Sequence, residues 1–149
     1  MKLVVEINNK SGERIKKSFF GNVIKKTLEL SEFYFLAKKE ISVSVALVDE
    51  KEIKEINRIY RKKNQPTDIL SFSEYKNSKD LEKGLFLGKE IFLGELILCY
   101  NDIAVYSRKN GKNLKKELSE TIAHGVLHLL GMKHGKKMFD IQKEIAGTI

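Results

Sequence analysis

Cysteine, proline and tryptophan are nearly absent from this 149-residue sequence, which contains one cysteine, one proline and no tryptophan. The single Cys99 excludes an intramolecular disulfide and therefore a disulfide-stabilised secreted scaffold. No N-terminal stretch combines a basic region, an apolar segment and a small-residue cleavage site. Every apolar run is also broken well before the roughly 18 residues that span a bilayer. We therefore expect a cytoplasmic protein with no membrane-spanning segment.

The composition is that of one folded domain. Hydrophobic residues make up 42% of the chain and charged residues 32%, far from the low hydrophobicity of disordered chains. A chain of this length forms one hydrophobic core more readily than two, so we expect a single domain over residues 1–149. The formal net charge of +8 favours a polyanionic partner such as RNA, DNA or anionic lipid, although many proteins are simply lysine-rich.

The spacing of apolar residues predicts strands that alternate with helices. Residues 41–48 alternate in the manner of a half-buried strand. Asp49 then occupies an N-cap position with Glu52 as its capping-box partner, which predicts a helix to about Tyr60. The full prediction is strands at 3–7, 41–48, 67–72 and 91–99, helices at 18–30, 50–60, 102–110, 114–131 and 136–146, and a loop at 73–90. This order predicts an α+β domain with about five helices packed on a small mixed four-stranded sheet.

The three histidines of the chain all lie between residues 124 and 134. His124 and His128 are four residues apart, so on a helix their side chains lie about 40° apart around the axis, one turn above each other. Gly131 ends this helix, and a glycine can adopt positive φ and reverse the chain, which brings His134 to the same point. The spacing therefore predicts a zincin-like metal-site helix with these three histidines as ligands.

Three imidazoles leave the fourth position of a tetrahedral zinc ion open. An open position for water is the layout of a catalytic zinc site, where the water ionises near neutral pH. We therefore predict a metal-dependent hydrolase with one Zn²⁺ per chain, although imidazole also accepts nickel, copper and iron. The alternatives are an ordinary histidine pair on an amphipathic helix and a three-histidine metal site without catalysis.

The histidine spacing is also that of the metzincin proteases, His-x-x-x-His-x-x-Gly-x-x-His. Those enzymes carry a catalytic glutamate directly after the first histidine, where this chain has Gly125. Peptide hydrolysis by that route is therefore disfavoured. Without this carboxylate, either the metal and its water act alone or another group accepts the proton.

Several segments are similar to the YbeY endoribonuclease family. The family signatures are His-Gly-x-Leu-His-Leu-x-Gly-Tyr-Asp-His, Leu-Asn-x-x-Tyr-Arg, Pro-Thr-Asp-Val-Leu-Ser-Phe and Leu-Gly-Asp-Ile. This chain has His124-Gly125-Val126-Leu127-His128-Leu129-Leu130-Gly131-Met132-Lys133-His134, Ile56-Asn57-Arg58-Ile59-Tyr60-Arg61, Pro66-Thr67-Asp68-Ile69-Leu70-Ser71-Phe72 and Leu93-Gly94-Glu95-Leu96. Met138-Phe139 with Gln142 looks like the C-terminal helix of the family, so the resemblance covers about residues 40–146.

The resemblance implies a single-strand-specific, metal-dependent endoribonuclease that acts in rRNA processing. It implies roles in maturation of the 16S rRNA 3′ end and in ribosome quality control, with single-stranded rRNA and the ribosome or its small subunit as partners. An important arginine of the family falls on Arg61, whose paired donors suit two phosphate oxygens. A solvated arginine beside Lys62 and Lys63 is the alternative.

Three further polar residues are weaker candidates. Asp68 and Ser71 would orient a ligand histidine or cap local turns, and Glu117 would accept a proton or remain a solvated helix residue. The chain also departs from the family where Met132-Lys133 replaces the usual Tyr-Asp. Loss of that carboxylate would weaken metal binding if it supports a ligand, whereas added lysines favour a phosphate backbone.

Two other functions are compatible with the sequence. One is a metallohydrolase of a peptide or amide, which would need a general base that Gly125 cannot supply. The other is an RNA-binding ribosome-assembly factor whose metal is structural. The oligomeric state is not determined by the sequence.

Overall fold

The fold is a four-stranded sheet with helices on both faces, seen in a computed structural model of which residues 1–148 are described, without the side chains of residues 85–87. Its elements are β1 (Lys2–Asn9), α1 (Lys17–Leu30), a 3₁₀ turn η1 (Tyr34–Leu36), β2 (Glu40–Val48), α2 (Glu50–Arg61), β3 (Ile69–Ser73), α3 (Ser78–Leu87), β4 (Glu90–Cys99), α4 (Tyr100–Lys109), α5 (Leu114–Leu129) and α6 (Lys136–Gly147). The predicted α+β class is confirmed.

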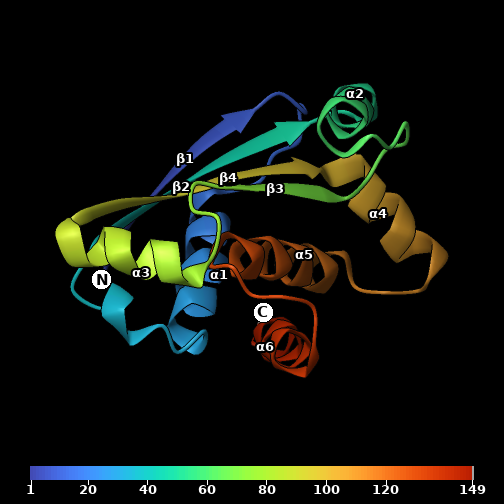
Figure 1. Cartoon of the computed structure of the whole chain (residues 1–149). Helices are drawn as coiled ribbons and strands as arrows, with labels where there is room; N and C mark the ends of the chain where they lie inside the picture. The colour runs from blue at the N-terminus through green and yellow to red at the C-terminus, as the bar shows by residue number, and fades with distance from the viewer. Residues whose placement is uncertain (149) are drawn as a thin grey trace.

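The sheet is mixed, as predicted. Its strand order is β1-β2-β4-β3, with β1, β2 and β4 parallel and β3 antiparallel to β4 at the edge. Helices α1 and α5 lie against one face with α6 beyond them, whereas α2 lies on the opposite face near the end of β2 (Figure 1). This arrangement places α5, which carries two of the histidines, directly against β3 and β4.

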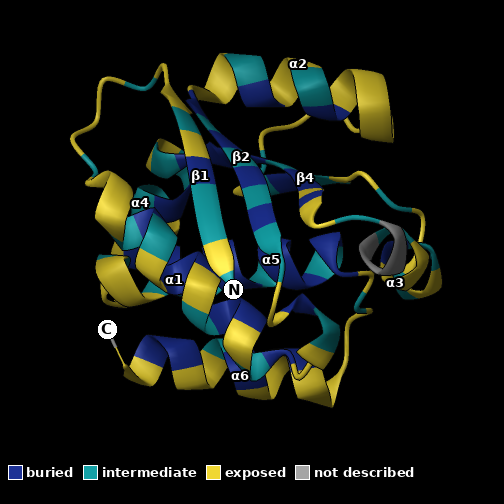
Figure 2. Ribbon diagram, turned by 90° about the vertical axis from the view of Figure 1, so that its left-hand side faces the viewer, coloured by how far each residue is buried: buried dark blue, intermediate teal, exposed yellow. Residues whose placement is uncertain are grey.

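Alternation along β2 divides its side chains between two cores. Ile41, Val43, Val45 and Leu47 are fully buried in the larger core with α1 and α5. Val48 belongs to a smaller core on the other face, where Ile53 of α2 packs. Helix α5 is buried along most of its length (Figure 2). The histidine helix is therefore held by the main core.

The capping prediction for α2 is confirmed. The Asp49 side chain accepts a hydrogen bond of 2.8 Å from the backbone N–H of Glu52, at the start of the helix. At the other end, Lys62 adopts a left-handed conformation with φ of 59°. The helix therefore stops directly after Arg61, at the edge of the sheet.

The predicted loop at 73–90 is wrong, because this segment contains α3. The Asn77 side chain caps the helix by accepting from the N–H of Asp80 at 2.9 Å, and Leu81 is fully buried. The prediction missed this helix because the segment is largely polar. The described residues form six α-helices where about five were predicted, and β3 starts two residues later than predicted. Among the described residues, no helix has the length and hydropathy needed to cross a membrane.

Gly94 lies at a bulge in the pairing of β4 with β2, at a point where the edge strand β3 also passes close to it. Its φ is +139°, and the register of β4 against β2 shifts at this point. Because of the bulge, Leu93 and Leu96 both face the main core although they are three residues apart. A Cβ on Gly94 would lie 2.2 Å from the carbonyl oxygen of Phe72.

Replacement of Gly94 with alanine is expected to destabilise the fold. The added Cβ meets backbone that cannot move away without breaking β3–β4 pairing, so we expect a loss of about 2 kcal/mol or more in the free energy of unfolding. Urea unfolding followed by circular dichroism measures this. Gly21→Ala is the matched control, since its Cβ meets nothing within 4 Å. Equal stability of the two variants would contradict this account of the bulge.

Candidate metal centre

Helix α5 approaches the sheet closely at Gly125. A Cβ at this position would lie 2.6 Å from Cδ1 of Ile69 and 2.8 Å from Cδ2 of Leu96. The residue after the first histidine therefore faces β3 and β4, and a side chain there would have to displace the side chains of Ile69 and Leu96. The absence of the metzincin glutamate thus has a packing reason in this fold.

The end of α5 reverses the chain, as the sequence predicts. Gly131 has φ of +84°, its N–H donates to the carbonyl of His128 at 2.9 Å, and the N–H of Met132 donates to the carbonyl of Leu127 at 3.0 Å. This pair of bonds is a Schellman motif. A Cβ on Gly131 would also lie 2.7 Å from the backbone nitrogen of Ser78, so only glycine fits the turn.

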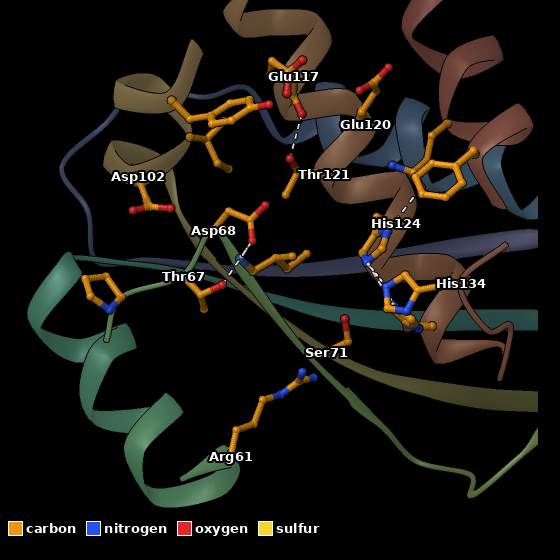
Figure 3. A pocket seen from close by; sticks show the side chains of 17 residues that line it. Arg61, Thr67, Asp68, Ser71, Asp102, Glu117, Glu120, Thr121, His124 and His134 are labelled. Carbon is orange, nitrogen blue, oxygen red and sulfur yellow. Dashed lines mark hydrogen bonds between the residues drawn. The ribbon is translucent and has the colours of Figure 1, made fainter. Parts of the chain in front are cut away.

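The reversal brings the three imidazoles together. The Nε2 atoms of His124 and His128 are 3.0 Å apart, and His134 Nε2 lies 3.3 Å from each of them. The three ligand atoms form a compact triangle at the surface of the cleft, and the group could hold a metal ion (Figure 3).

The donor set fits a divalent first-row metal ion. Nitrogen ligands about 2.1 Å from a tetrahedral zinc lie about 3.4 Å from one another, close to the distances between these nitrogens. A neutral imidazole has one N–H and one lone pair, so three such rings cannot all be paired by hydrogen bonds in a closed triangle. Three lone pairs that point at one centre repel each other, and a cation at that centre removes the repulsion.

Acceptors on the far side of two rings fix which nitrogen faces the triangle. Nδ1 of His124 lies 3.2 Å from Oε1 of Gln142 on α6. Nδ1 of His128 lies 3.1 Å from the backbone carbonyl of Met132. Each acceptor keeps a proton on Nδ1 and leaves the Nε2 lone pair for a metal. The Gln142 contact was not predicted, because it joins two helices through side chains 18 residues apart.

The environment also favours the neutral form of His128. Burial lowers the pKa of this imidazole, and positive charge on His124, His134 and Arg61 lowers it further, against the hydrogen bond to Met132. An imidazole whose pKa lies below its usual value of about 6.5 is neutral at physiological pH. Neutral imidazole is the form that binds metals.

The histidines lie in a cleft of about 670 Å³ between α2, β3, α4, α5 and α6. Arg61 extends from the end of α2 toward Ser71 and the histidines (Figure 3). Four carboxylates, Asp68, Asp102, Glu117 and Glu120, line the other part of the cleft. Burial raises the pKa of both Asp102 and Glu120, and neighbouring carboxylates raise them further. The cleft therefore has a cationic part beside the histidines and an acidic part away from them.

A hydrogen bond from the buried side-chain amide of Asn57 fixes the loop after Arg61. Asn57, which is 2% exposed, donates from Nδ2 to the backbone carbonyl of Gln65 at 2.9 Å. Within the described part of the chain Arg61 makes no ion pair, whereas the neighbouring Arg58 pairs with Glu55. The Arg61 side chain therefore lines the cleft with its donors available to a ligand.

Of the weaker candidates, Asp68 has a local role. Its carboxylate accepts from the N–H of Ile69 at 2.8 Å and from the hydroxyl of Thr67 at 3.3 Å. The alternative of a local cap is therefore correct for Asp68, and its contacts do not include a histidine. Glu117 forms an ion pair with Lys112, with its Oε1 3.7 Å from Nζ of the lysine. Ser71 points into the cleft between Arg61 and the histidines (Figure 3).

Met132, which stands where the family usually has tyrosine, contacts a ligand histidine through its backbone. Met132 supports His128 through its backbone carbonyl, which every residue type provides, and its side chain packs on the core. Lys133 is exposed. The support of His128 therefore does not depend on which side chain stands at position 132.

Known proteins with the same sequence pattern identify the family. A family model described as Endoribonuclease YbeY matches residues 6–149. Endoribonuclease YbeY of Bacillus cytotoxicus is 34% identical over 156 residues, covering 99% of this chain and 97% of that protein. Endoribonuclease YbeY of Caldicellulosiruptor bescii is 40% identical over 102 residues, covering 67% of this chain and 65% of that protein. The chain belongs to the YbeY endoribonuclease family.

The structure agrees with this membership. The solution structure of TM1509 from Thermotoga maritima has a TM-score of 0.60 and 28% identity, and the match covers 96% of this chain and 87% of that one. The predicted YbeY family and the predicted enzyme class, an endoribonuclease and hence a hydrolase, are confirmed. The family match begins at residue 6, so it includes the second half of β1 and all of α1, which carry none of the quoted signatures.

Gln142 is expected to set the affinity of the histidine cluster for zinc. Loss of a hydrogen-bond partner of a ligating histidine typically costs about 10- to 100-fold in metal affinity. We therefore expect Gln142→Leu to bind zinc about 10-fold or more weakly, and Gln142→Glu, which keeps an acceptor, to bind at least as tightly as the parent. Competition with a chelator of known affinity measures this.

The neighbouring Lys143→Leu is the matched control, because residue 143 is exposed on the same helix. Circular dichroism confirms that each variant is folded. Unchanged zinc affinity in a folded Gln142→Leu variant would show that Gln142 does not support the site.

Proposed function

We propose that His124, His128 and His134 hold one Zn²⁺ ion and that the chain cleaves single-stranded RNA at this site. The observation that carries the proposal is the triangle of Nε2 atoms, 3.0 to 3.3 Å apart, that lines one cleft with Arg61. Residues 1–149 would form one metal-dependent endoribonuclease domain.

Different residues of the chain would support the metal ligands and bind the phosphate. Bound zinc supplies a Lewis acid and lowers the pKa of coordinated water. Gln142 and the Met132 carbonyl hold two of the ligand rings in their orientation. Arg61 offers paired N–H donors to two phosphate oxygens, and its charge stabilises the negative charge that develops there.

The dimensions of the cleft favour a single strand. A volume of about 670 Å³ is in the range of sites for small molecules, roughly 300 to 1,000 Å³, so it admits one or two nucleotides and not a duplex. An unpaired strand can turn one phosphate toward Arg61 and place its bases elsewhere in the cleft. RNA also carries its own nucleophile, the 2′-hydroxyl, so both this group and water remain available for attack.

The biological setting follows from family membership. We propose that the chain acts in rRNA processing, including maturation of the 16S rRNA 3′ end, and in ribosome quality control, with the small ribosomal subunit as its partner. The net charge of +8 and the unpaired Arg61 support a ribonucleoprotein partner. The free, buried Cys99 is consistent with a cytoplasmic location.

Cleavage assays with matched variants test the proposed reaction. We expect the zinc-loaded chain to cut an unstructured RNA, and a chelator or His128→Ala to abolish cutting. Arg61→Ala should lower kcat/KM for RNA by about 100-fold, since loss of one donor to developing charge costs about 10²–10³ in rate. Arg58→Ala is the control, because Arg58 already pairs with Glu55.

Zinc affinity distinguishes a residue that binds the metal from one that binds the phosphate. We expect Arg61→Ala to keep the zinc affinity of the parent, whereas His128→Ala should lose it. Cleavage of casein and not of RNA would instead favour an amide hydrolase. A folded, zinc-loaded chain that binds RNA but never cuts it would favour an assembly factor with a structural metal.

A further inference from the structure

Phe139 is an exposed aromatic residue beside the histidine cluster. It belongs to α6, whose other large apolar side chains, Met138, Ile141 and Ile145, are buried. Phe139 is 54% exposed and lines the same cleft as the histidines and Arg61. An isolated exposed apolar residue has no special meaning, but this one lies within the substrate cleft.

The position of Phe139 on α6 places it near Gln142, the partner of the ligand His124. Phe139 lies three residues before Gln142, so the two side chains share one face of the helix. Gln142 Oε1 lies 3.2 Å from Nδ1 of His124. Phe139 therefore lies in the same cleft as the histidines, on the helix face that carries the partner of His124.

The ring of Phe139 has no stacking partner among the described residues. Two other exposed aromatics have such a neighbour: Tyr60 packs edge-on against Phe72 with ring centroids 5.3 Å apart, and Lys112 Nζ lies 5.6 Å from the centroid of the Tyr106 ring. Among the described residues the exposed Tyr34 and Phe92, like Phe139, have no such neighbour, but they do not line the cleft. In the described part of the chain, neither a ring nor a cation covers Phe139 in this way. Its face is open to a planar ligand in the cleft.

We propose that Phe139 stacks on the nucleobase next to the scissile phosphate. This inference rests on the proposed reaction at the three histidines and adds a base subsite to it. Every nucleobase has a π face, so stacking on an aromatic side chain binds a base without reading its identity. A base inside a duplex already stacks on its neighbours, so the subsite accepts an unpaired base and contributes to selection of single strands.

A double-mutant cycle, in which the Phe139 ring and one nucleobase are removed separately and together, tests the proposed stacking contact. The substrate is a short unstructured RNA with one mapped cleavage site, and its partners carry an abasic nucleotide directly 5′ or directly 3′ of that site. Each RNA is cut by the parent chain, by Phe139→Ala and by Phe139→Tyr, which keeps the ring. Phe92→Ala is the control, because Phe92 is 42% exposed but does not line the cleft.

We expect Phe139→Ala to lower kcat/KM by about 5- to 150-fold, which is the range for loss of one stacked base. The parent chain should lose the same factor on one of the two abasic substrates, and Phe139→Ala should lose nothing further on it. Phe139→Tyr and Phe92→Ala should behave like the parent. The proposal would be overturned if the loss caused by Phe139→Ala and the loss caused by the abasic nucleotide multiplied on both substrates. An unchanged kcat/KM in Phe139→Ala would also overturn it.

Two further measurements distinguish this inference from the reaction that it rests on. Zinc affinity of Phe139→Ala should match the parent, since a fall in affinity would reassign the residue to support of the metal site. The same cycle measured as RNA binding by fluorescence anisotropy needs no cleavage site when the abasic nucleotide is moved through each position of a short RNA. A parent chain that shows the cycle in binding but cuts no RNA would overturn the proposed reaction and leave the base subsite standing.

Discussion

The site depends on the close approach of three imidazole nitrogens that repel each other unless a cation lies between them. Their separations of 3.0 to 3.3 Å require two ligands one helical turn apart and a third that returns to the same point within a few residues. The turn at Gly131 provides that return, since its positive φ and its contact with Ser78 exclude a side chain. The chain therefore holds an arrangement that is costly in the absence of a metal.

The rest of the fold holds α5 and the walls of the cleft in place. Gly125 allows α5 to pack closely against β3 and β4, and Gly94 allows the close approach of β3 to β4 at Phe72. Packing of α6 on α5 brings Gln142 to His124 and leaves Phe139 in the cleft. Helix α2 ends at Arg61 across the cleft. The walls of the cleft thus carry the three histidines, Arg61 and the exposed ring of Phe139.

Features that depend on neighbouring residues could be predicted from the sequence. The four-residue spacing of His124 and His128, the glycine at 131 and the cap at Asp49 are local patterns with local physical causes, and the structure has all of them. Helix α3 was missed because its signal, the Asn77 cap, lies in a polar segment without a clear apolar stripe. The role of Gln142 was missed for another reason, since it requires knowing how α6 packs on α5. Similarly, the sequence does not decide whether Asp68 supports a ligand histidine or caps a local turn, because this depends on where β3 starts.

The central claim is that the three histidines bind one metal ion in a four-coordinate site, and a cobalt titration tests it most directly. Cobalt(II) replaces zinc and absorbs visible light strongly when tetrahedral and weakly when octahedral. Titration of the metal-free chain should give intense tetrahedral absorption that saturates at one equivalent of Co²⁺ and disappears in His134→Ala. Weak octahedral absorption, or saturation unaffected by His134→Ala, would contradict the account.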